Sequence, residues 1–83
     1  MSPHRNESLN WNEMSVEDIL RLAIADEEEA QEYYHHAAHC VGGYHTRRML
    51  LKLSEMEKGH AEELRKELDD LLVQRAMETG MAD

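Results

Sequence analysis

The chain has 83 residues, so it forms at most one small domain, of a size at which a single hydrophobic core gives little stability without a metal, a disulfide or self-association. Nine Lys and Arg residues against 18 Asp and Glu residues give a formal net charge of -9, which repels phosphate backbones and anionic lipids and argues against nucleic acid or a membrane as a partner. The single Cys40 excludes an intramolecular disulfide, and there is neither a signal-peptide-like apolar run nor a stretch of about 20 apolar residues, so we expect a cytoplasmic protein.

Residues 1–14 contain the only proline of the chain, Pro3, and show no sustained hydrophobic period, which predicts a flexible N-terminal arm. The residues that follow, Ser15 to Asp18, resemble a capping box, in which a serine and an acidic residue three positions later accept hydrogen bonds from each other's backbone N–H groups. A helix is therefore predicted to begin at Ser15.

The first helix is predicted over residues 15–41, because neither Gly nor Pro interrupts it. Gly42 and Gly43 follow directly, and a glycine that adopts a positive φ is a common way to end a helix. The sequence therefore predicts a tight turn at residues 42–44.

The second helix is predicted over residues 45–78, again without a helix breaker, and Gly80 lies just beyond it in a short tail at 80–83. Residues 15–79 then form one domain, an antiparallel two-helix hairpin of the all-α class. No segment shows the alternation of polar and apolar residues that would predict a strand.

Positions that step by three and four residues along each predicted helix form a largely apolar stripe. On the first helix the stripe consists of Leu20, Ile24, Glu27, Gln31, Tyr34, Ala38 and Val41. On the second helix it consists of Leu50, Leu53, Glu57, His60, Leu64, Leu68 and Leu71. Three ionisable residues, Glu27, Glu57 and His60, thus interrupt the two stripes.

Glu57 and His60 form a Glu-x-x-His pair, a spacing expected roughly once by chance in a chain with 13 Glu and 6 His residues. A second such pair, Glu32 and His35, is displaced from the direction of Glu27 by roughly 140° and 80° at about 100° per residue, so it lies on a flank of its helix. Of the two pairs, only Glu57 and His60 lie on a stripe.

The three polar interruptions also lie at one level of the predicted hairpin. Counted from the turn at about 1.5 Å per residue, Glu27, Glu57 and His60 lie about 23, 22 and 26 Å away. Burying each unpaired charge there costs on the order of several kcal/mol unless the group is paired or coordinates a cation. A bound metal ion is the simplest compensation.

One hairpin supplies only three such ligands, which is too few for a site with two cations. A twofold dimer doubles them to two glutamates and two Glu-x-x-His pairs, which is the ligand set of carboxylate-bridged di-iron sites in four-helix bundles. Oxygen ligands with one nitrogen per ion suit Fe or Mn better than a closed structural Zn site. We therefore expect a homodimer that forms a four-helix bundle and binds a di-iron centre, with Mn or Zn as alternative metals.

Two segments, EEEAQEYY at residues 27–34 and EMEKGHAEEL at residues 55–64, resemble the rubrerythrin-type ferritin-like superfamily. Its metal-binding helices carry Glu-x-x-Ala before an aromatic pair and Glu-x-x-His-Ala. The resemblance covers roughly residues 15–72. The length of a single hairpin and the interval of 30 residues between Glu27 and Glu57 are similar to those of the encapsulated ferritins.

By this resemblance the three ionisable stripe residues correspond to di-iron ligands, Tyr34 to the second residue of the aromatic pair beside the site, and Asp26 and Glu29 to an acidic patch where metal ions approach. In the encapsulated ferritins two hairpins build a ferroxidase centre, and the dimers assemble further into a ring inside an encapsulin shell. The resemblance therefore implies a higher homo-oligomer as encapsulin cargo, and an encapsulin compartment as an alternative location.

The expected function is ferroxidase activity, the oxidation of Fe(II) with O₂ or peroxide at a site shared between two subunits, in iron storage or detoxification. Glu27 and Glu57 would bridge or chelate the ions and His60 would cap each one. One alternative is a rubrerythrin-like di-metal enzyme that reduces peroxide with an external electron donor. Another is a non-catalytic helical dimerisation module, whose buried polar residues only fix the register of the helices.

Overall fold

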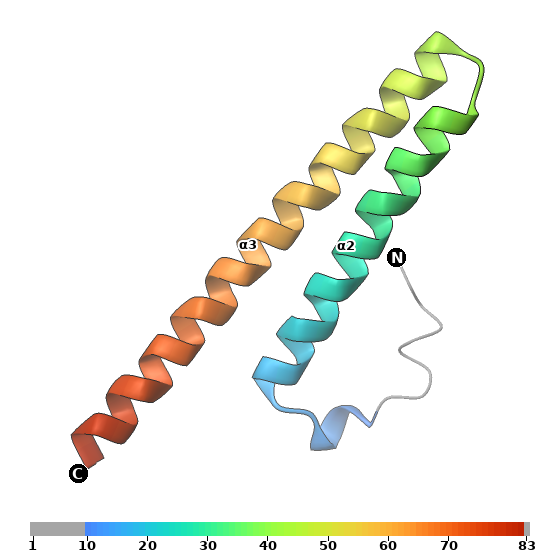
Figure 1. The fold of residues 1–83 in the computed structure, drawn as a ribbon. Helices are drawn as coiled ribbons and strands as arrows, with labels where there is room; N and C mark the ends of the chain where they lie inside the picture. The colour runs from blue at the N-terminus through green and yellow to red at the C-terminus, as the bar shows by residue number, and fades with distance from the viewer. Residues whose placement is uncertain (1–9, 83) are drawn as a thin grey trace.

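The computed structural model describes residues 10–82 of the chain. It contains a short 3₁₀ helix, η1 (Trp11–Glu13), and two long helices, α2 (Val16–Cys40) and α3 (Tyr44–Ala82). The long helices run antiparallel and side by side, and α3 extends beyond the first turn of α2 (Figure 1). No strand occurs in the described part, which confirms the predicted all-α helical hairpin. Neither long helix carries an apolar stretch that would cross a lipid bilayer.

The N-terminus of α2 forms the capping box that the sequence predicts. Ser15 Oγ accepts a hydrogen bond from the Asp18 backbone N–H at 3.1 Å, and Asp18 Oδ2 accepts one from the Ser15 N–H at 3.4 Å. These two bonds satisfy backbone donors that have no partner within the helix. The helix itself begins at Val16, one residue after its cap.

The predicted arm at 1–14 lies only partly in the described structure, because residues 1–9 are outside it. Within the described part, η1 forms directly before α2, and Asn10 Oδ1 accepts a hydrogen bond from the Asn12 N–H at 3.2 Å. A short helical turn therefore occupies a segment in which the sequence predicts none.

The turn between the long helices differs from its prediction. Val41 leaves α2 in an extended conformation, with φ -88° and ψ 148°, and neither Gly42 nor Gly43 has a positive φ. The prediction that a glycine in the left-handed region ends the helix is therefore wrong. Instead, the Arg47 side chain donates a hydrogen bond to the Val41 carbonyl at 3.0 Å and thereby ties the turn to the first part of α3.

The predicted end of α3 at residue 78 is also wrong, because the helix continues through Gly80 to Ala82. The predicted tail at 80–83 is thus helical over 80–82, and residue 83 is outside the described part. A glycine inside a helix costs only about 1 kcal/mol relative to alanine, so it does not end a helix unless its backbone leaves the helical region.

Small side chains fill much of the interface between α2 and α3 and let the two backbones come close. The buried residues of this interface are Ile24, Ala30, Ala38, Ser54, Ala61 and Leu68. Ser54 Oγ also donates a hydrogen bond to the Gln31 carbonyl of α2 at 3.0 Å. This bond sets residue 31 opposite residue 54 and so fixes the register of the hairpin at the level where the ionisable residues lie.

Candidate metal centre

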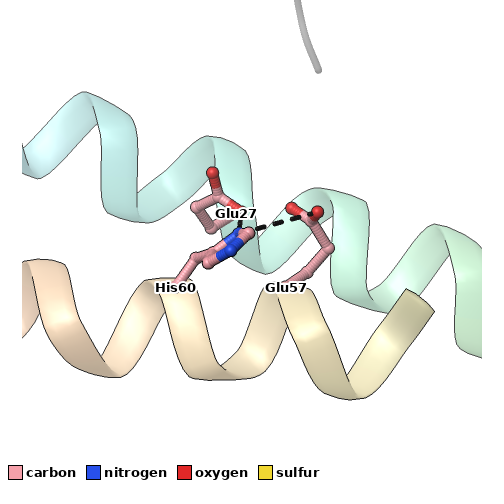
Figure 2. Close-up of side chains that lie close together, drawn as sticks. All are labelled: Glu27, Glu57 and His60. Carbon is pink, nitrogen blue, oxygen red and sulfur yellow. Dashed lines mark ion pairs between the residues drawn. The ribbon is translucent and has the colours of Figure 1, made fainter. Parts of the chain in front are cut away.

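Glu27 on α2 and the pair Glu57 and His60 on α3 meet across the helix interface (Figure 2). Each offers one ligand atom, and these atoms all lie within 4.8 Å of one another. His60 Nδ1 lies 3.4 Å from Glu27 Oε2 and 3.9 Å from Glu57 Oε1. Within residues 10–82, this is the one place where at least three His, Cys, Asp or Glu side chains converge in this way.

The convergence follows from helix geometry and from the register. Residues three apart on an α-helix project on one face, so Glu57 and His60 point toward α2 together. The hydrogen bond between Ser54 and the Gln31 carbonyl aligns the two helices. One helical turn from this bond, on the side away from the loop, Glu27 faces Glu57 and His60. The structure thus brings together the three residues that interrupt the apolar stripes.

The two carboxylates are more buried than the imidazole. The Glu57 and Glu27 side chains are 17% and 25% exposed, whereas the His60 side chain is 51% exposed. The stripe pattern suggests a buried imidazole, but His60 lies about 60° around α3 from Glu57 and therefore at the edge of the interface. One side of the site is open to solvent for this reason.

The buried oxygen Glu27 Oε2 receives no hydrogen bond from the described residues. His60 Nδ1 faces it at 3.4 Å, a separation too long for a strong hydrogen bond. Leaving a buried acceptor without a donor costs about 1–3 kcal/mol. The atom is therefore well placed to donate a lone pair to a metal ion.

Glu27 also perturbs Glu57. The pKa of the Glu57 carboxyl is raised from its ordinary value, first because its protonated form donates a hydrogen bond to Glu27, and further because it is removed from water and lies near the like charge of Glu27. The nearby imidazole of His60 lowers the pKa and so partly opposes these effects. Without a cation, the ionised form of Glu57 is therefore less favourable than that of an ordinary glutamate.

The donor set fits a metal ion. Metal–ligand bonds of about 2.0–2.2 Å place two ligand atoms of one ion about 3.0–3.5 Å apart, close to the separation between Glu27 Oε2 and His60 Nδ1. A cation would satisfy the unpaired carboxylate oxygen and offset the repulsion between the two carboxylates. Two carboxylates and one imidazole are ligands for Fe or Mn, and they also accept Zn.

The open side of the site leads into a shallow depression of about 480 Å³. Its lining consists of Glu27, His60, Glu63, Leu64, Lys66 and Glu67. Glu63 and Glu67 were not predicted as site residues from the sequence, although they follow His60 by three and seven residues and so share its face of α3. Their carboxylates make the mouth of the site favourable for cations.

The other residues that the resemblance suggests lie along α2. Tyr34 is half-buried about two turns from Glu27, and its ring packs edge-on against Tyr33 with the ring centroids 5.4 Å apart. Asp26 is half-buried and Glu29 is exposed. The roles of Tyr34 beside the site and of Asp26 and Glu29 in the approach of metal ions stay predictions.

The second Glu-x-x-His pair lies on a flank, as predicted. Glu32 and His35 are both exposed, and they line a different open depression on α2. The pair therefore contributes nothing to the convergence around Glu27, and its spacing alone carries no functional information.

Comparison with known proteins identifies the family of this chain. The family profile with the description Rubrerythrin matches residues 18–80, which contain all three converging side chains. Searches among curated proteins and among solved structures give no significant match. Because the matched segment is well over half of the chain, the chain belongs to the rubrerythrin family.

Proposed function

We propose that this chain is a ferroxidase that oxidises Fe(II) at a di-iron carboxylate site shared between two subunits, in iron storage or detoxification. The convergence of Glu27, Glu57 and His60 within 4.8 Å carries this proposal. The rubrerythrin family typically binds iron, and the oxygen-rich donor set agrees with that metal.

Two features support sharing of the site between subunits. The first is the number of ligands, because three side chains cannot satisfy two ions, whereas a twofold axis supplies two glutamates and two Glu-x-x-His pairs. The second is that apolar side chains are exposed on the side of α3 that carries His60. Met49 and Met56 precede His60 by eleven and four residues, so they share its flank, and they are 57% and 48% exposed. A second copy seated there would cover both methionines and the open side of the site.

The residues of the chain have distinct tasks in this proposal. Glu27 and Glu57 bind the Fe(II) substrate through oxygen, and the cation offsets the like-charge repulsion that helps to raise the pKa of Glu57. His60 binds through Nδ1, the nitrogen that faces both carboxylates. Oxidation of two Fe(II) ions to Fe(III) would supply the two electrons, and solvent the two protons, that convert one O₂ into H₂O₂. The formal net charge of -9 and the carboxylates at the mouth of the site attract the substrate.

The family match favours a second candidate, a di-metal enzyme that reduces peroxide with electrons from an external donor. The same three ligands would serve it. The two functions differ in which reaction is faster: a ferroxidase consumes Fe(II) rapidly with O₂, whereas a peroxide reductase turns over repeatedly with peroxide only when a donor is supplied.

Two further proposals rest on the resemblance to the encapsulated ferritins. One is that the dimers assemble into a ring inside an encapsulin shell. The other is that the protein is located in the cytoplasm or in such a shell.

The two Glu-x-x-His pairs provide the test. Metal-free protein is mixed with Fe(II) under O₂, and the appearance of Fe(III) is followed by absorbance together with O₂ uptake. We expect His60→Ala to slow oxidation by at least about 10–100-fold. Removing a residue that only orients a metal ligand already causes a loss of this size, and His60 is proposed to bind the metal directly. His35→Ala, which changes an exposed histidine with the same spacing from a glutamate, should leave the rate nearly unchanged. Equal losses in the two variants would contradict the proposed site.

A further inference from the structure

The last turn of α2 carries a second group of metal-ligating side chains, far from the Glu27 site. His36 and Cys40 are four residues apart and both exposed, and Cys40 Sγ lies 3.7 Å from His36 Nε2. His36 lies nine residues beyond Glu27, about 14 Å along the helix and on the opposite side of it. The two groups therefore cannot share one ion.

The separation of these two atoms matches a pair of ligands on one ion. A Zn–S bond of about 2.3 Å and a Zn–N bond of about 2.0–2.1 Å, joined at a tetrahedral angle, place sulfur and nitrogen about 3.6 Å apart. The observed separation of 3.7 Å is close to this value. The site also lies at the C-terminal end of α2, where the partial negative charge of the helix favours a cation.

We infer that His36 and Cys40 form a second cation site, one that selects borderline metals such as Zn(II) and Co(II) over Fe(II). A thiolate with an imidazole is a softer donor set than the two carboxylates and one imidazole of the first site. Two protein ligands leave the remaining positions to water, so the ion is exchangeable, unlike one in a closed structural site. The inference does not depend on the ferroxidase proposal, because it uses none of the same residues.

The same turn provides an internal control. His35 and His39 are also four residues apart, and their rings lie 4.7 Å from each other. This pair is rotated by about 100° from His36 and Cys40 and contains no sulfur. A spectroscopic signal that requires sulfur therefore reports on the Cys40 site and not on the neighbouring histidines.

The experiment is a Co(II) titration of the full-length, reduced protein, followed by absorption spectroscopy. We expect a sulfur-to-Co(II) charge-transfer band in the wild type and equally in Glu57→Ala, with loss of the band when Zn(II) is added. Cys40→Ser should abolish the band, and His36→Ala should raise the Co(II) dissociation constant at least about tenfold, because one metal–ligand bond is lost. His35→Ala should change neither the band nor the affinity.

Circular dichroism of each variant verifies that the helices are retained, which these exposed positions should allow. Absence of the band from the wild type at saturating Co(II), or its survival in Cys40→Ser, would overturn the inference. An unchanged dissociation constant in His36→Ala would also overturn it, because the thiol would then bind metal without the imidazole.

Discussion

At the scale of single residues, the candidate centre is costly for the protein without metal. Glu27 Oε2 is buried without a hydrogen-bond donor, and Glu57 holds a proton more tightly than an ordinary glutamate because Glu27 lies beside it. Apolar side chains at these positions would favour folding more, because burying two carboxylates lowers the stability of the folded state and burying leucines does not. The stripe is therefore interrupted at the point where a cation would compensate the cost.

Replacing Glu57 by Gln should stabilise the metal-free protein. The raised pKa of Glu57 means that protonation stabilises the folded state; this contribution is fully present below the ordinary pKa of 4.5 and is lost as pH rises through the raised value. Gln is neutral at every pH and can still donate a hydrogen bond to Glu27. The variant should therefore be more stable than the wild type at pH 7 by roughly 1 kcal/mol.

That difference should shrink as the pH is lowered toward the ordinary pKa of glutamate. Denaturant titrations of chelator-treated protein at several pH values and one fixed protein concentration would measure it. The matched control is Glu55→Gln, which removes an exposed carboxylate from the same helix and should change the free energy of unfolding little. If Glu57→Gln and Glu55→Gln gave the same pH profile, the coupling between Glu27 and Glu57 would be refuted.

At the scale of the elements, α3 is the longer and less supported helix. Its 39 residues exceed the 25 of α2, so its C-terminal part projects beyond the hairpin partner. One contact that holds this part is the ion pair between Arg75 and Glu17 at 3.1 Å. Arg65 and Glu28 form a second cross-helix ion pair. Exposed pairs of this kind contribute only about 0–1 kcal/mol each, so apolar contacts and the intrinsic helix propensity of α3 carry most of its stability.

Gly59 lies in the interior of α3 and has a low helix propensity. A Cβ added there meets no atom within 4 Å, so Gly59→Ala should raise the free energy of unfolding by about 1 kcal/mol, the propensity difference between the two residues. Thermal melting monitored by circular dichroism would measure the gain. Gly80→Ala should give a smaller gain because it lies in the fraying last turn. A loss of stability in Gly59→Ala would show that another chain approaches this part of α3.

At the scale of the whole molecule, two helices do not enclose a substantial core. The hairpin measures 61 × 26 × 12 Å, and none of the large side chains that the structure describes is fully buried. Large apolar side chains are exposed instead, among them Tyr33, Met49 and Met56. A chain of this size usually needs an external source of stability, and pairing of two hairpins into a four-helix bundle would supply both the buried area and the missing metal ligands.

Mixed oligomers should reveal whether the site is shared. If wild-type and Glu27→Ala chains are combined at a ratio of one to one, half of the wild-type chains pair with a variant that lacks one carboxylate. Iron oxidation per wild-type chain should then fall to about half, provided that mixed dimers are inactive and assort randomly. Stopped-flow absorbance would give the rate, and mass spectrometry would verify the exchange of subunits.

The control mixes wild-type chains with His35→Ala chains, which should retain full activity per chain. Activity strictly proportional to the wild-type fraction in the Glu27→Ala mixture would place the site within single chains and exclude the intersubunit centre.

The sequence by itself determines the helical hairpin, the cap at Ser15 and the placement of Glu27, Glu57 and His60 on facing stripes. These features depend on helical periodicity and on the chemistry of a helix start, which are local properties of the chain. Only the tertiary structure decides that Val41 and not a glycine ends α2, that Ser54 bonds to α2, and that Gly80 stays helical. The half-exposed position of His60 and the raised pKa of Glu57 likewise depend on groups from the other helix or at the edge of the interface. No pattern within one segment specifies such contacts, because their distances are set by how closely the two helices approach and in which register.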